Sequence, residues 1–211
     1  MAGTITRLQF QKRNIERVNV YIDGEFAFGL DAVQAAGLRK GQHLSTAEIA
    51  ALRQQDDRQK AFDRAVRFLG VRPRSQAEVE SYLKGKMLDD GTIADVIGRL
   101  ERMGYLDDQA FARFWIENRQ RFRPRSKLAL RFELQQKGVG RDVVAEATAD
   151  VDEEEAAWQA MENKLGRWYN LQPEDFRRKV YDFLRRRGFN YDIIKKTFER
   201  ACQALNIDFE A

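Results

Sequence analysis

An internal repeat constrains this chain more than any other feature. The tetrapeptide Arg-Pro-Arg-Ser at residues 72–75 recurs at residues 123–126, a shift of 51. The same shift keeps later positions in register, and the matched pairs are Leu83 with Leu134, Lys86 with Lys137, and Ile93 with Val144. Self-similarity at a period of this size is typical of stacked supersecondary units. We therefore expect the chain to be built from repeated modules.

A third, fainter copy follows at a shift of 50 residues. Its matched pairs are Leu134 with Leu184, Lys137 with Arg187, Gly138 with Gly188, and Val144 with Ile194. The three prolines, at positions 73, 124 and 173, are spaced close to this period. Two of them stand just before a serine, where proline's fixed φ and missing N–H are tolerated at a helix start. We interpret each copy as three helices, the second of which begins near its proline.

Capping signals place the helix starts in the first two copies. Ser75-x-x-Glu78 is a capping box, in which the serine accepts from a backbone amide and the glutamate reaches back to the serine N–H. In the second copy Ala129 replaces the glutamate, so Ser126 is expected to cap alone.

The connection between these copies has its own pattern, Gly104-Tyr105-Leu106-Asp107-Asp108. Gly104 is expected to end a helix, and an aspartate is expected to cap the next one. Tyr105 and Leu106 are expected to anchor the connection in the core.

The first 30 residues have a different pattern. Apolar residues alternate in short runs over about 4–30, and the Asp-Gly dipeptide at 23–24 suits a two-residue hairpin turn. This predicts a small antiparallel sheet, followed by a short helix near 31–36. A capping box, Ser45-x-x-Glu48, then opens a helix that runs to about residue 69.

The predicted fold is mainly α, with a small N-terminal antiparallel β segment and three tandem three-helix repeats in an elongated, curved array. We expect an N-terminal extension over 1–44 and repeats over 45–107, 108–152 and 153–211. Hydrophobic residues are 43% and charged residues 33% of the 211 residues, which is too apolar for a disordered chain and too charged for a membrane protein. No secretory signal is visible at the N-terminus, so a cytoplasmic protein is expected.

Residues suited to catalysis are sparse. The chain has one histidine, His43, and no glycine-rich phosphate loop. The single cysteine, Cys202, excludes an intramolecular disulfide and is expected to be a small apolar residue on the last helix. Aspartate pairs at 56–57, 89–90 and 107–108 could hold Mg²⁺ in a nuclease, but we expect each to lie near a helix start or in a loop as a cap. The prediction is therefore a protein that is not an enzyme, with no cofactor and no metal.

Basic residues are the more informative group. The net charge is +4, and arginines flank each of the first two prolines at predicted helix starts, where a cation opposes the helix dipole. Recurrence of this unfavourable choice indicates an anionic partner, either a phosphate backbone or an acidic protein face. The alternative is that these arginines pair with acids in the neighbouring repeat. The contact candidates are Arg72, Arg74, Arg123, Arg125, Lys127, Arg131, Lys137, Arg177, Arg178, Lys179, Arg185, Arg186 and Arg187.

Aromatic residues interleave with these cations. Phe122, Trp168 and Tyr169 could stack on bases, whereas Trp115 and Trp158 are expected in the core. Arg178 and Arg185 are seven residues apart and so share a helix face.

Taken together, these motifs resemble those of the RecX family, bacterial regulators of the RecA recombinase. The resemblance covers nearly the whole chain and is densest over 60–145. The motifs that carry it are Arg74-Ser75-x-x-Glu78 with Leu83 and Lys86, Gly104-Tyr105-Leu106-Asp107-Asp108-x-x-Phe111-Ala112 with Trp115 and Arg119, then Arg125-Ser126 and Glu133-Leu134-x-x-Lys137-Gly138-Val139.

The resemblance implies a non-enzymatic modulator. It would bind RecA and the groove of the RecA–ssDNA filament, limit ATPase, strand exchange and co-protease activity, and bind DNA directly. We expect the protein itself to be a monomer with no role at a membrane. The alternative is a stand-alone DNA-binding protein, since three-helix units resemble helix-turn-helix domains.

Overall fold

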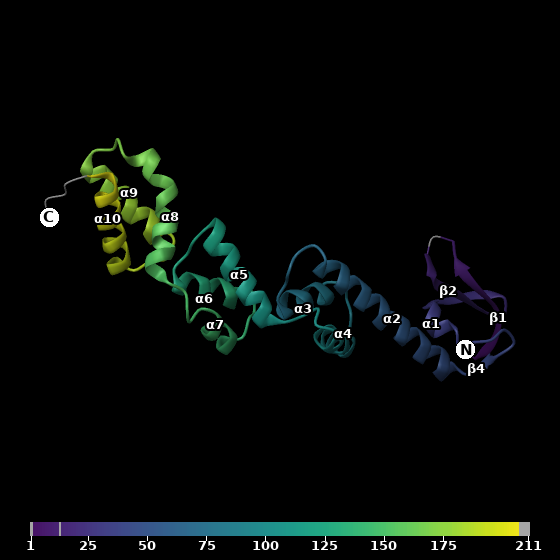
Figure 1. The fold of residues 1–211 in the computed structure, drawn as a ribbon. Coiled ribbons are helices and arrows are strands. Elements are labelled where there is room, and N and C mark those ends of the chain that lie inside the picture. The colour runs from purple at the N-terminus through teal and green to yellow at the C-terminus, as the bar shows by residue number, and fades with distance from the viewer. Residues whose placement is uncertain (1, 13, 207–211) are drawn as a thin grey trace. The chain divides into compact units, whose positions relative to one another are not determined.

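A computed structural model describes residues 2–12 and 14–206 of the chain. The described part is mainly helical, with a small sheet at its N-terminal end (Figure 1). The chain divides into two compact units, one formed by residues 1–72 and 79–105 and the other by residues 73–78 and 106–211. The start of the helix that follows Ser75 thus belongs to the second unit, although the rest of that helix belongs to the first.

The sheet is antiparallel, as predicted. Its strands are β1 (Gly3–Gln11), β2 (Asn14–Ile22), β3 (Glu25–Asp31) and β4 (His43–Leu44), in the order β3-β2-β1-β4. Asp23 and Gly24 have φ of 49° and 91°, which confirms the two-residue turn between β2 and β3. The sequence pattern did not predict β4, because a strand of two residues has no alternation to detect.

Two helices continue from the sheet. Asp31 caps α1 (Ala32–Ala35), and Ser45 caps α2 (Thr46–Leu69) with both bonds of the capping box present. The core beneath the sheet includes Ile5, Val20, Leu30 and Leu44, all at most 2% exposed, with Ile49 of α2. Apolar burial of this kind fixes α2 to the sheet.

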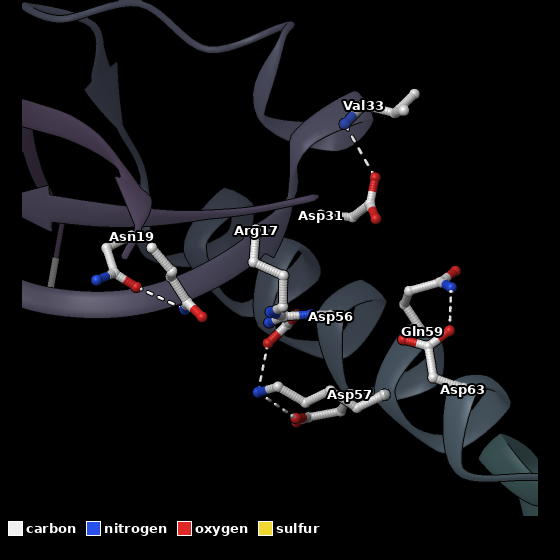
Figure 2. A network of polar contacts seen from close by, with 10 residues as sticks. Arg17, Asn19, Asp31, Val33, Asp56, Asp57, Gln59 and Asp63 are labelled. Atoms are coloured by element: carbon white, nitrogen blue, oxygen red, sulfur yellow. Dashed lines mark hydrogen bonds and ion pairs between the residues drawn. The ribbon is translucent and has the colours of Figure 1, made fainter. Parts of the chain in front are cut away.

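A buried carboxylate adds a polar contact between the sheet and α2. Asp56, only 2% exposed, lies 2.5 Å from Arg17 of β2 and 2.5 Å from Lys60, whereas Asp57 on the same helix is exposed (Figure 2). The expectation that every aspartate pair lies near a helix start or in a loop is therefore wrong for Asp56 and Asp57, which lie inside α2. Asp89 and Asp107 do cap helices, as predicted.

The first repeat consists of α2, α3 (Gln76–Lys84) and α4 (Asp90–Arg102). Val79, Leu83 and Leu100 are fully buried in it. Gly104 ends α4 with φ of 71°, the left-handed conformation predicted for it. Leu106 is buried but Tyr105 is 52% exposed, so the prediction that both anchor the connection is wrong for Tyr105. The Tyr105 N–H donates to the Leu100 carbonyl at 2.9 Å as part of the helix end, so the backbone of Tyr105, and not its side chain, is held there.

The second unit contains the other two repeats (Figure 1). The second repeat comprises α5 (Asp108–Phe122), α6 (Lys127–Gln136) and α7 (Arg141–Ala147), and the third comprises α8 (Glu153–Trp168), α9 (Pro173–Arg185) and α10 (Tyr191–Leu205). Each repeat has its own apolar cluster. Trp115 and Trp158 are partly buried against these clusters. Cys202 is buried on α10, as predicted, and this burial raises the pKa of its thiol.

Neither a metal site nor a membrane span is found in the described residues. No group of three or more histidine, cysteine, aspartate or glutamate side chains there could hold a metal ion. No helix among them is long and apolar enough to cross a bilayer.

Candidate interface at the repeat junctions

The serine of the first repeated tetrapeptide makes two contacts at once. Ser75 is fully buried, and its Oγ accepts from the Glu78 N–H at 3.2 Å while the Ser75 N–H faces the Glu78 carboxylate at 3.4 Å, which confirms the capping box. The same Oγ donates to the carbonyl of Lys137 in the following repeat. Beside it, Gly138 has φ of 77°, and a Cβ at Gly138 would overlap the Cβ of Ala77. The glycine turn after α6 therefore docks closely on the start of α3.

The second junction repeats this arrangement. Ser126 is 1% exposed, caps α6 by accepting from the Ala129 N–H at 3.1 Å, and donates its own N–H to the carbonyl of Arg187 at 3.2 Å. Gly188 has φ of 90°, and a Cβ there would lie 2.7 Å from Ser126 Oγ and 2.9 Å from the Ala129 Cβ. Small residues on both sides thus allow the close approach of consecutive repeats.

Acids of the following repeat complement the helix starts at both junctions. The Gln76 N–H donates to the Asp108 carboxylate at 2.8 Å, and the Lys127 N–H donates to the Glu153 carboxylate at 2.9 Å. A carboxylate is stabilising at the positive end of a helix. The neighbouring repeat therefore supplies the negative charge that the tetrapeptide itself lacks, so arginines can be accommodated there.

Arg125 has an acidic partner in its own repeat. Its Nε lies 3.3 Å from one carboxylate oxygen of Glu133, and the other oxygen of that carboxylate accepts from Trp115 Nε1 at 2.9 Å and from Arg119 Nε at 2.7 Å. Arg125 additionally donates to the carbonyl of Arg186 at 3.4 Å. For this residue the alternative of an acid in the neighbouring repeat is wrong, because the ion pair lies within the second repeat. One carboxylate is shared by two guanidinium groups, which leaves an excess of positive charge.

Arg187 lies next to this pair and adds to the excess. It donates to the carbonyl of Pro124 at 2.8 Å, and its guanidinium lies 4.5 Å from the centre of the Phe183 ring. Burial lowers the pKa of Arg187, and the like charges of Arg123 and Arg125 lower that pKa further. Arginine stays protonated under such a shift. Within residues 2–12 and 14–206, no carboxylate lies at ion-pair distance from Arg123 or Arg187.

A hollow of about 280 Å³ opens beside these arginines. Arg121, Phe122, Lys164 and Arg187 are among the residues that line it, and the Phe122 ring is 70% exposed. We define the basic junction as the set Arg121, Phe122, Arg123, Arg125, Lys164 and Arg187. Lys164 was missed by the sequence reasoning, because only the fold brings α8 beside the second tetrapeptide.

The other predicted contact residues are distributed more widely. Three have partners within the second unit: Lys137 pairs with Glu78 at 2.9 Å, Arg131 donates to Thr148 at 2.8 Å, and Lys127 Nζ donates to the Ala149 carbonyl at 2.8 Å. Arg72 and Arg74 are half-buried before α3. The remaining five, Arg177, Arg178, Lys179, Arg185 and Arg186, are exposed on α9 or directly after it.

Two ion pairs involve exposed arginines of α9. Arg178 lies 2.6 Å from Asp175, and Arg185 lies 3.6 Å from Asp182. Pairs at such exposed positions contribute little to stability, so both arginines can exchange these partners for another anion.

The fold and this site define a helical-repeat protein that presents unneutralised arginines at a junction between modules. Comparison with known families gives this class a specific assignment. Four family models match: the Regulatory protein RecX N-terminal domain at residues 3–45, and the first, second and third three-helix domains of RecX at residues 61–100, 107–147 and 152–198. The chain belongs to the RecX family.

Relatives and solved structures agree with this assignment. The chain is 32% identical to Regulatory protein RecX of Bacillus subtilis (strain 168), over 93% of this chain and 76% of that protein. It is 29% identical to Regulatory protein RecX of Clostridium botulinum (strain Eklund 17B / Type B), over 93% of this chain and 95% of that protein. The fold resembles a crystal structure of regulatory protein RecX, with a TM-score of 0.74 at 23% identity, covering 93% of this chain and 99% of the other.

A second solved structure shares the fold over a smaller part of the chain. RecX from Lactobacillus salivarius superposes with a TM-score of 0.61 at 20% identity, covering 73% of this chain and 99% of the other.

Proposed function

We propose that this chain is a non-enzymatic regulator that binds RecA and the RecA–DNA filament and inhibits recombinase, ATPase and co-protease activity. The observation that carries the proposal is the excess positive charge of Arg123, Arg125 and Arg187 in a protein of the RecX family. Guanidinium groups held in place by neighbouring side chains suit phosphate or carboxylate groups. In this proposal the protein acts in the cytoplasm, as a monomer and without a cofactor.

Several weak contacts are expected to add along such a partner. Repeat proteins present the same type of surface once per module, and contacts made by linked modules add through effective concentration. The exposed arginines of α9, including Arg178 and Arg185, are the proposed second contact of the third repeat. Arg72 and Arg74 are proposed as the corresponding contact of the first tetrapeptide.

The test is inhibition of RecA ATPase at fixed RecA and fixed single-stranded DNA. The variant Arg121→Glu with Arg123→Glu reverses two exposed charges of the basic junction without touching the buried Ser126 cap. We expect the concentration for half-inhibition to rise about tenfold or more, since each tenfold corresponds to about 1.4 kcal/mol. Circular dichroism should show unchanged helicity.

The matched control is Arg113→Glu with Arg141→Glu. Both arginines are exposed in the second repeat, so the change in net charge is identical. An equal loss of inhibition in the control would mean that bulk charge alone decides binding. Unchanged inhibition in the Arg121 and Arg123 variant would remove the basic junction from the interface.

The second candidate function is stand-alone DNA binding, which the same excess of positive charge also favours. DNA binding is then measured in the absence of RecA, over a range of salt concentrations. If ATPase inhibition appears only where the protein already saturates the DNA, competition for DNA explains it and the RecA-directed proposal fails. Inhibition well below saturation supports the proposal.

A further inference from the structure

A larger hollow lies in the first compact unit, away from the residues discussed so far. Its volume is about 400 Å³, within the range of small-molecule sites. Three helices of that unit contribute: α1 through Gln34, α2 through Gln55, Arg58, Gln59 and Phe62, and α4 through Asp95, Arg99 and Arg102. None of these residues belongs to the tetrapeptides.

Positive charge converges on this hollow from two helices. Arg58 comes from α2, and Arg99 and Arg102 come from the last turn of α4. Of the described residues that line the hollow, Asp95 is the only carboxylate, and it lies 3.2 Å from Arg58. The dipole of α4 stabilises cations in its own last turn, and Asp95 offsets only one of the three arginines.

Arg99 is held in place by neutral groups. Its guanidinium lies 3.8 Å from the centre of the Phe62 ring and donates to the side-chain Oε1 of Gln59 at 2.8 Å. Gln59 is itself oriented, because its amide nitrogen donates to Asp63 at 2.8 Å (Figure 2). A guanidinium fixed in this way, to which no carboxylate of the described residues is bonded, is prepared for an incoming anion.

Gly98 contributes space for a second arginine. A Cβ at this position would lie 3.3 Å from a terminal nitrogen of Arg102. The end of the Arg102 side chain therefore lies close to the α4 backbone at Gly98, beside the hollow.

Gln34 contributes an acceptor that needs a hydrogen-bond donor, whereas the arginines are donors that need an anion. Its Oε1 is buried and has no hydrogen-bond partner among the described residues. A buried acceptor without a partner is unfavourable until a donor arrives. Ionised phosphate and carboxylate groups accept hydrogen bonds but donate none, so a simple anion cannot satisfy the Gln34 oxygen. A nucleobase can, because its edge carries N–H donors.

We propose that this hollow binds a nucleotide, with the phosphate groups at Arg58, Arg99 and Arg102 and an N–H-bearing edge of the base toward Gln34. The stacked pair of Phe62 and Arg99 offers a flat cationic surface beside the base. The nucleotide is either a free mononucleotide or a unit of a single strand, since both present the same groups. The site is independent of the basic junction and of the proposed action on RecA.

The experiment is isothermal titration of the full chain with dATP, with adenosine and with inorganic pyrophosphate. We expect dATP to bind at least tenfold more tightly than either fragment, because each fragment satisfies only one half of the site. Binding of pyrophosphate as tight as that of dATP would overturn the role of the base. Absence of dATP binding would overturn the proposal entirely.

Variants locate the site. Arg99→Gln with Arg102→Gln should weaken dATP binding about tenfold or more, and Ala94→Trp should do the same by filling the hollow without changing charge. Arg64→Gln with Arg67→Gln, on exposed positions of α2 outside the hollow, is the charge-matched control and should bind as the unmodified chain does. Equal weakening in the control, or undiminished binding by a folded Ala94→Trp variant, would contradict the proposal.

A thymidine oligonucleotide distinguishes the two sources of the nucleotide. If dATP displaces the oligonucleotide, and the Arg99 and Arg102 variant binds the oligonucleotide less tightly, the pocket takes a unit of a strand. If dATP binds without displacing it, the pocket takes a free nucleotide. RecA ATPase inhibition by the same variants is expected to be unchanged, so failure here is separable from failure of the proposed function.

Discussion

At the residue scale, two glycines with the same backbone conformation differ in what surrounds them. Gly138 has φ of 77° and its missing Cβ would overlap Ala77, whereas Gly104 has φ of 71° with open space around it. Left-handed φ costs an L-residue about 1–2 kcal/mol, and overlap in a packed site adds about 1–3 kcal/mol. Gly138→Ala should therefore lower the free energy of unfolding by about 3 kcal/mol, and Gly104→Ala by about 1 kcal/mol.

Urea denaturation followed by circular dichroism measures both values. The difference between the two variants is the contribution of close approach between consecutive repeats. Equal losses would show that backbone conformation alone requires glycine at residue 138, and that the turn does not need to dock on Ala77.

At the element scale, the turn after the middle helix of each repeat shows what docking requires. Met87, Gly138 and Gly188 occupy corresponding positions, by shifts of 51 and 50, and all have positive φ. The two glycines meet the serine-capped helix start of the repeat before them, whereas Met87 is 97% exposed. Glycine is required where the turn docks, and a strained methionine is tolerated where it does not.

This comparison predicts that Met87→Gly is stabilising. Relief of left-handed strain should outweigh the greater entropy that glycine has in the unfolded chain. The free energy of unfolding should rise by about 1 kcal/mol in urea denaturation. A fall instead would show that the Met87 side chain makes a contact that outweighs its strain.

The same scale separates what the sequence could predict from what it could not. Repeat period, helix starts and the hairpin turn depend on residues close together in the chain, such as Ser45 with Glu48 or Asp23 with Gly24, and these predictions are confirmed. The strand β4, the burial of Asp56 and the exposure of Tyr105 depend on partners distant in sequence. Periodicity contains no information about such partners.

The candidate site also has a part that the sequence could predict and a part that it could not. Arg123 and Arg125 were found because they recur, and Arg187 because it follows the third copy's register. That these three gather at one junction, and that Lys164 joins them, follows only from the packing of α8 and α9 against the second repeat. No sequence pattern indicated the hollow at Arg58, Arg99 and Arg102, since none of these arginines recurs with the repeat.

At the scale of the whole molecule, the two compact units contain different spectroscopic probes. All three tryptophans, Trp115, Trp158 and Trp168, lie in the unit formed by residues 73–78 and 106–211. Helices contribute to circular dichroism in both units. Tryptophan fluorescence therefore reports on one unit alone, and separate cores of this kind can unfold in separate steps.

Asp56→Asn tests this separation. The substitution removes the charge that faces Arg17 and Lys60, and breaking a buried ion pair costs several kcal/mol. Because Lys60 is 43% exposed and water screens it, we expect a loss of about 2 kcal/mol. The circular-dichroism transition of the first unit should move to a lower urea concentration, while the midpoint of tryptophan fluorescence stays unchanged.

The control is Asp57→Asn, on the same helix but 65% exposed, which should leave both signals unchanged. A shift of the fluorescence midpoint by the same amount as the dichroism midpoint would show that the two units unfold as one cooperative structure.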